Sequence, residues 1–150
     1  MKKLVLVAAM ASAVVSGEAM AACSNGGDSN QVTTLGALLT GRTVCVANGS
    51  GGWESQEFHQ TGSGGAVIDW KLGSNAMDPT QTVGSWSVAG AGANNTVSYA
   101  YSGGGVYSYT VYKNGTGATA TYSFCGGTPA EIVTTIKTGQ GSCSSLPAIP

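Results

Sequence analysis

The chain has 150 residues, of which only 9% are charged, and its formal net charge is −1. This length suits one ordinary domain, and so sparse a charge excludes the basic surface that binds nucleic acid or anionic lipid. The 24 glycines follow no Gly-X-Y period, which excludes collagen. They gather between apolar segments, where turns require them.

The N-terminal residues have the pattern of a bacterial secretory signal peptide. Lys2 and Lys3 precede an apolar run over residues 4–15, and the small residues of Ala19-Met20-Ala21 fit a cleavage site after Ala21. The run is too short for an anchor, and no later segment has the roughly 20 apolar residues of a transmembrane helix. We therefore predict that residues 1–21 are removed and that the protein is secreted or periplasmic.

The exported part divides into a short N-terminal segment and one β domain. Residues 22–42 are expected to hold one short helix, over Thr33–Leu39. Residues 43–150 are expected to form a single β domain with a C-terminal tail, because eight segments rich in β-branched and aromatic residues are each bounded by turn residues. These segments are Thr43–Asn48, Trp53–Gln60, Gly65–Gly73, Thr82–Gly90, Thr96–Ser102, Val106–Asn114, Thr119–Gly126 and Glu131–Gly139. Their regular spacing predicts an all-β fold, an antiparallel meander of six to eight strands closed into a small β-barrel, with a β-sandwich as the alternative.

Alternation along these strands predicts one inner face that is rich in aromatic residues. The residues placed on it are Ile68, Trp70 and Leu72, Trp86 and Val88, Val97, Tyr99 and Tyr101, Tyr107, Tyr109 and Val111, and Tyr122 and Phe124. The opposite faces carry Ser, Thr, Gly and Lys, as a sheet with one buried face demands. Two interpretations stay open: a plain hydrophobic core, or a barrel lumen that holds a small apolar or aromatic ligand.

The segment Trp53–His59 is the one strand that concentrates charge, and it holds the only histidine of the chain. In a strand, Trp53, Glu57 and His59 point to one face, and Asp69 can lie beside them on the next strand. Two interpretations of this face stay open: a plain exposed strand, or an exposed face that binds a ligand through charge-assisted hydrogen bonds. A hydrolase that uses Glu57 and His59 for acid–base chemistry is a further interpretation, but the sequence has no nucleophile motif such as G-x-S-x-G.

Four cysteines in an exported chain predict two disulfides. A closed barrel places its last strand beside its first, which would pair Cys45 with Cys143 and leave Cys23 for Cys125; an open sandwich would allow Cys23–Cys45 and Cys125–Cys143. Lipidation of Cys23 is an alternative, because residues 20–23 are similar to a bacterial lipobox. We predict no metal site, since the sequence has no Cys-x-x-Cys pair, and no cofactor.

The stretch Val83-Gly84-Ser85-Trp86, followed by short meander strands, resembles the Gly-x-Trp strand of lipocalin- and avidin-type barrels. In those families the motif lies on the first strand, whereas three predicted strands precede it here. The resemblance implies small-molecule binding inside a barrel.

Two classes of function follow from these patterns. The first is a non-enzymatic binding module that recognises a small molecule or surface glycan through an aromatic-lined cavity or a strand face. The second is a structural subunit of an extracellular filament or surface layer, which assembles with copies of itself by strand or surface contacts; an unpaired edge strand would favour it. Neither class involves nucleic acid or a transmembrane segment. The candidate ligand-binding residues are Trp53, Glu57, His59, Asp69, Trp70, Trp86, Tyr99 and Tyr109.

Overall fold

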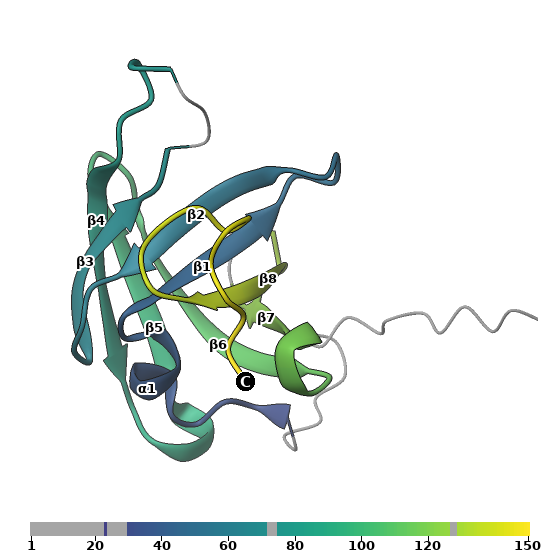
Figure 1. Ribbon diagram of the computed structural model, residues 1–150. Coiled ribbons are helices and arrows are strands. Elements are labelled where there is room, and N and C mark those ends of the chain that lie inside the picture. The colour runs from purple at the N-terminus through teal and green to yellow at the C-terminus, as the bar shows by residue number, and fades with distance from the viewer. Residues whose placement is uncertain (1–22, 24–29, 72–74, 127–128) are drawn as a thin grey trace, which may run out of the picture.

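The computed structural model describes residues 23, 30–71, 75–126 and 129–150 as a closed antiparallel β-barrel (Figure 1). Each strand pairs with the next, and β8 pairs with β1. The strands are β1 (Arg42–Ala47), β2 (Trp53–His59), β3 (Gly64–Asp69), β4 (Gln81–Ala89), β5 (Thr96–Tyr101), β6 (Val106–Asn114), β7 (Thr121–Cys125) and β8 (Glu131–Thr138). The predicted all-β meander and its closure are thus confirmed, while the predicted signal peptide lies outside the described residues.

The two ends of the barrel differ. The helix α1 (Leu35–Leu39) lies across the end at which β1, β3, β5 and β7 begin, which we call the helix end (Figure 1). Leu35 and Leu39 are fully buried there. Asn95, itself buried, ties the helix to the β4–β5 connection: its Oδ1 accepts from the N–H of Leu35 (3.0 Å), and its Nδ2 donates to the carbonyl of Gly90 (3.0 Å). We call the opposite end, where β2, β4, β6 and β8 begin, the open end.

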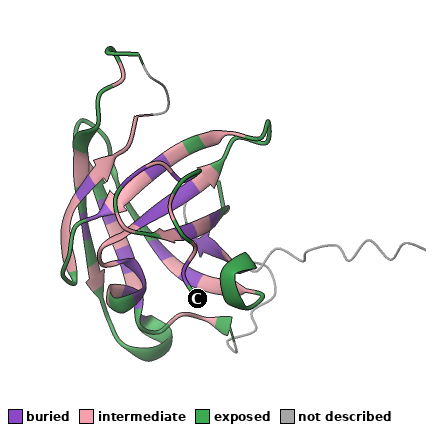
Figure 2. Cartoon of the chain, viewed as in Figure 1, coloured by how far each residue is buried: buried purple, intermediate pink, exposed green. Residues whose placement is uncertain are grey.

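The predicted aromatic inner face is confirmed from β4 onward except at Tyr107, which is 40% exposed. Alternation of buried and exposed residues is visible along the strands (Figure 2). The buried inner residues include Trp86, Val97, Tyr99, Tyr109, Val111, Tyr122 and Phe124. The prediction for β3 is wrong, because Val67 is fully buried and Ile68 is not, while Leu72 lies outside the described residues. The reason is register: Val67 pairs with the inward-pointing His59, so Ile68 must point to the other face.

Gly84 and Trp86 of the Gly-x-Trp stretch have separate structural roles in β4. A Cβ at Gly84 would collide with the carbonyl oxygen of Ala100 on β5, so only glycine allows this close approach. Trp86, two residues later on the same face, is 2% exposed in the core.

Two disulfides join segments that are distant in the sequence. They are Cys23–Cys125 and Cys45–Cys143, the pairing predicted for a closed barrel. Since the sulfur of Cys23 is bonded to Cys125, it is not free to carry a lipid thioether.

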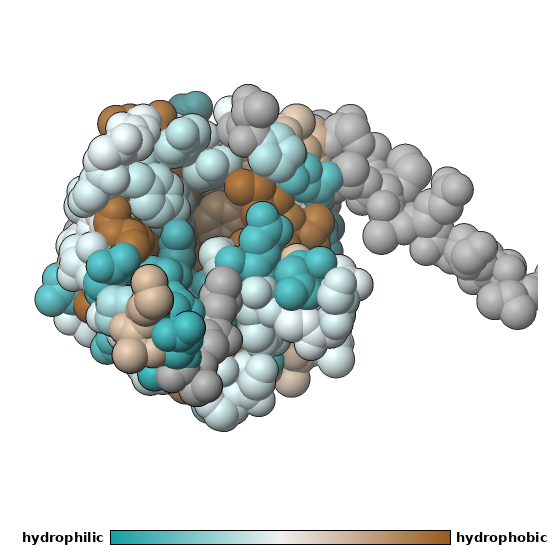
Figure 3. Space-filling view, turned by 90° about the horizontal axis from the view of Figure 1, so that it is seen from above, coloured by the Kyte–Doolittle hydropathy of each residue, from teal (hydrophilic) through white to brown (hydrophobic). Residues whose placement is uncertain are grey.

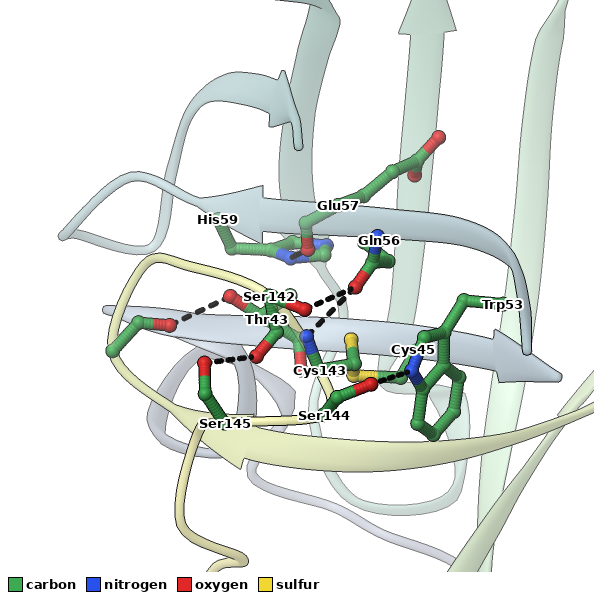
Figure 4. Close-up of a disulfide and its surroundings, with 11 residues drawn as sticks. Thr43, Cys45, Trp53, Gln56, Glu57, His59, Ser142, Cys143, Ser144 and Ser145 are labelled. Atoms are coloured by element: carbon green, nitrogen blue, oxygen red, sulfur yellow. Dashed lines mark hydrogen bonds between the residues drawn. A yellow bond between two sulfur atoms is a disulfide. The ribbon is translucent and has the colours of Figure 1, made fainter. Parts of the chain in front are cut away.

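The second disulfide fastens the C-terminal tail to the outer face of β1 and β2 (Figure 4). Gln56 is buried beneath the tail, and its Oε1 accepts from the N–H of Cys143 (2.7 Å). The Trp53 indole N–H donates to Ser144 Oγ (2.9 Å). Gln56 is therefore a buried polar side chain whose hydrogen bond is satisfied by the tail and holds the tail in place. Among the residues that the structure describes, no helix has the length and hydropathy to span a membrane.

Candidate functional site

A cavity of about 90 Å³ enters the barrel at the open end. Viewed onto this end, the molecule has a central hollow with apolar side chains in its wall (Figure 3). The lining combines the rings of Tyr99, Tyr101, Tyr109 and Phe124, the aliphatic side chains of Val44, Val46 and Ile132, and the polar side chains of Ser55, Glu57 and Thr134. The predicted aromatic lumen is therefore present at one end of the barrel and filled by side chains at the other.

The cavity continues into a groove between β1 and β8. These strands pair only where Arg42–Cys45 faces Thr135–Thr138, and no pairing is described between them closer to the open end. A groove of about 410 Å³ runs there, and it shares Val46, Ser55 and Ile132 with the cavity. A bound molecule can thus have one part in the cavity and another in the groove.

Glu57 is the carboxylate in the cavity wall. The hydroxyl of Tyr101 donates a hydrogen bond to its Oε2 (2.8 Å), and Asp69 lies opposite it in the β2–β3 register. Burial raises the pKa of Glu57; the Tyr101 hydrogen bond opposes the shift, and the charge of Asp69 adds to it. The pKa of Asp69 is also raised, by burial first and then by the charge of Asp78. Among the described residues that line the cavity, Glu57 thus has no Lys, Arg or His beside it.

His59 lies deeper in the barrel and is fully buried. Its Nδ1 lies 3.1 Å from the carbonyl oxygen of Glu57, which can only accept, so Nδ1 carries the proton. Its Nε2 then accepts from the Tyr99 hydroxyl (2.8 Å). Burial lowers the pKa of His59 to about 4, so the ring is neutral at pH 7. With both nitrogens occupied, His59 positions Tyr99 and does not offer a base to the cavity.

The tyrosines form one cluster of touching rings. The rings of Tyr99 and Tyr101 stack with centroids 6.0 Å apart and an interplanar angle of 11°. Tyr109 lies 6.0 Å from Tyr99 and 5.9 Å from Phe124 by ring centroids, edge to face in both pairs. Burial raises the pKa of all three tyrosines, which keeps their hydroxyls protonated as hydrogen-bond donors at neutral pH.

The structure unites two sites that the sequence suggested separately. Glu57, His59 and Asp69, predicted on an exposed strand face, point inward with the aromatic residues. The exposed interpretation is therefore wrong for His59, whose side chain is fully buried. The reason is that alternation along β2 fixes which residues share a face but not which face is inside.

The tryptophans do not line the cavity. Trp53 and Glu57 point to opposite sides of β2 (Figure 4), because the β1–β2 register shifts between Val46 and Ala47. Trp53 bonds the C-terminal tail instead. Trp70 follows β3 and donates its backbone N–H to the carbonyl of Gln56 (2.8 Å), and Trp86 packs edge-to-face against His59 with ring centroids 5.2 Å apart.

Sequence reasoning missed Tyr101 as a site residue, although it placed Tyr101 on the inner face. Its position at the last residue of β5, next to an end of the barrel, was the available signal. Its hydrogen bond to Glu57 joins β5 to β2, a contact over 44 residues of sequence, which only the barrel closure brings about.

Charge is segregated between the two ends of the barrel. In the described part of the chain, the acidic residues Glu54, Glu57, Asp69, Asp78 and Glu131 all lie toward the open end with Lys71, whereas Arg42, Lys113 and Lys137 lie toward the helix end. In the described residues, the open end therefore has more acidic than basic side chains.

Within the described ranges, no three His, Cys, Asp or Glu side chains gather into a group that could hold a metal ion. Comparisons of the chain with models of protein families, with curated proteins and with solved structures found no match.

Proposed function

We propose that the chain is an exported, non-enzymatic binding protein that holds a small molecule in the open end of its barrel. The observation that carries the proposal is the cavity itself, whose lining combines the Glu57 carboxylate, held by Tyr101, with the rings of Tyr99, Tyr109 and Phe124. Apolar walls with a few fixed polar groups are the usual composition of a small-molecule site. The resemblance of the Gly84–Trp86 stretch to lipocalin and avidin barrels implies the same class of function.

The size of the cavity supports a small ligand or a small part of a larger one. About 90 Å³ has room for a few water molecules or for a group of roughly four to six heavy atoms. The adjoining groove along β1 and β8 would accept the rest of a longer molecule. Two disulfides in the barrel support a rigid site outside the cytoplasm, where disulfides persist.

The alternative function, a filament subunit that assembles by adding strands, has less support because the barrel is closed. A subunit of that kind needs a long unpaired edge, whereas every described strand has a neighbour on both sides along part of its length. The position of His59 likewise gives a hydrolase less support, because both of its nitrogens are engaged within the barrel.

A cavity-filling variant tests the proposal. Val46 is half-buried in the cavity wall where β1 and β8 separate, so Val46→Phe should place a ring in the mouth and leave the fold intact. We expect the affinity for small molecules to fall by at least about tenfold, measured by ligand-observed NMR against a panel of neutral, anionic and cationic fragments.

The matched control is Val106→Phe, which adds the same ring at a side chain 71% exposed on β6. It should bind the fragments as the unaltered protein does. Equal binding by both variants, with both folded by circular dichroism, would place the ligand outside the barrel and contradict the proposal.

A further inference from the structure

We propose that the ligand of the open end is a small organic cation, an ammonium group with apolar substituents. This inference rests on the proposed function and adds the chemical class of the ligand. Three features of the cavity carry it: the charges that line it, the charges around its mouth and the arrangement of its rings.

The wall of the cavity is anionic on one side and apolar elsewhere. Glu57 is the acidic residue of the lining, and none of the described lining residues is Lys, Arg or His. A carboxylate ligand would meet Glu57 with no cation to compensate it. A neutral ligand would gain a hydrogen bond to Glu57, whereas an ammonium would gain a charge-assisted one.

The groups that face Glu57 from neighbouring strands favour the same ligand. Asp69 lies opposite it on β3, Tyr101 of β5 donates to it, and Tyr99 and Tyr109 interact with it electrostatically from β5 and β6. None of these groups is positive. Lys71 lies two residues beyond Asp69 in the chain, and it is outside the cavity lining.

The rings supply a second attraction that a neutral ligand would lack. Aromatic faces are negative, and cations bind over them, most strongly where several rings surround a desolvated site. Tyr99 and Tyr101 lie nearly parallel, with Tyr109 and Phe124 turned against them. The Tyr101 hydroxyl is fixed by its bond to Glu57, so one residue links the carboxylate to the ring cluster. Alkyl groups on the cation would contact the same rings and the aliphatic wall.

The test uses two probes of the same size and shape, tert-butylammonium and tert-butanol, and one larger anionic probe, pivalate. By calorimetric or NMR titration of the full exported chain at pH 7, we expect tert-butylammonium to bind at least about tenfold more tightly than tert-butanol and pivalate to bind more weakly than either. Glu57→Gln should bring the cation and the alcohol to within about twofold of each other.

The control is Asp78→Asn, which removes one carboxylate from the open end at a residue that lines neither the cavity nor the groove. It should leave the preference for the cation unchanged. An equal loss in both variants would mean diffuse attraction by the acidic end and would overturn the role of Glu57. Tyr101→Phe removes only the hydroxyl that is bonded to Glu57 and should weaken the preference for the cation. This variant replaces Glu57→Gln in the test if Glu57→Gln does not fold.

The pH dependence gives an independent readout. Because burial and Asp69 raise the pKa of Glu57, protons compete with the cation, so affinity in the unaltered chain should rise as the pH is raised through that elevated pKa. The rise should be smaller in Glu57→Gln, which keeps only the Asp69 carboxyl. Equal affinity for all three probes would overturn the cation inference and leave the proposed function standing. Absence of binding by every probe would overturn both.

Discussion

Replacing Cys45 and Cys143 together by serine is expected to lower the free energy of unfolding by about 5 kcal/mol, the chain-entropy value for a loop of about 100 residues. The two cysteines are 98 residues apart, so the crosslink strongly restricts the unfolded chain. The loss should be visible as a lower midpoint in urea denaturation. In the folded state the tail would keep the hydrogen bond from Cys143 N–H to Gln56 but lose its covalent link to β1.

The second disulfide provides the comparison. Cys23 and Cys125 are 102 residues apart, so the same chain-entropy argument predicts nearly the same loss when both are replaced by serine. Only the Cys45/Cys143 variant should also lose hydrogen-exchange protection at the Cys143 position and in β1. A loss below about 1 kcal/mol in either double variant would contradict the argument.

Lowering the pH from 7 to 4 should cost about 3 kcal/mol of stability through His59 alone, because one pKa unit corresponds to about 1.4 kcal/mol. The pKa of His59 is about 4 in the folded chain, against 6.5 for an ordinary histidine. Between these values the unfolded chain binds a proton that the folded chain does not. The stabilisation is therefore fully present above pH 6.5 and is lost as the pH falls toward 4. Urea denaturation at a series of pH values measures it.

The carboxyl groups of Glu57 and Asp69 have the opposite effect on stability, over a range of pH that overlaps that of His59. The pKa values of Glu57 and Asp69 are raised in the folded chain, so their protonation on folding adds stability as the pH falls through those raised values. His59→Gln removes the histidine titration and keeps both carboxyls, and the difference between the two pH profiles isolates His59. Parallel profiles would contradict a buried neutral histidine.

The fold could be predicted because each strand carries its own local signals. Turn glycines and asparagines bound β6, and its predicted and observed limits coincide at Val106 and Asn114. The prediction for β3 extended to Gly73, but the strand ends at Asp69. The described pairing of β3 with β2 ends at Asp69. After it, the backbone N–H of Trp70 donates one more hydrogen bond to β2, to the carbonyl of Gln56. The end of that strand depends on its neighbour, which the local pattern does not contain.

The site could be predicted only in pieces. The sequence singled out Glu57, His59 and Asp69 by their charge and Tyr99 and Tyr109 by their alternation, but it could not join the two groups. Charge normally indicates an exposed face. Here the cost of burying His59 is offset by two hydrogen bonds, and the cost for Glu57 is offset by Tyr101 and by its position at the open end. These compensations come from strands far apart in the sequence.

The measurement that tests the central claim most directly is an aromatic ¹H–¹³C correlation spectrum of the exported chain titrated with tert-butylammonium. If the open end of the barrel is the binding site, the signals of Tyr99, Tyr101, Tyr109 and Phe124 should shift together with one dissociation constant, while those of Trp53 beneath the tail stay in place. Shifts at Trp53 with an unchanged tyrosine cluster would contradict a binding site inside the barrel.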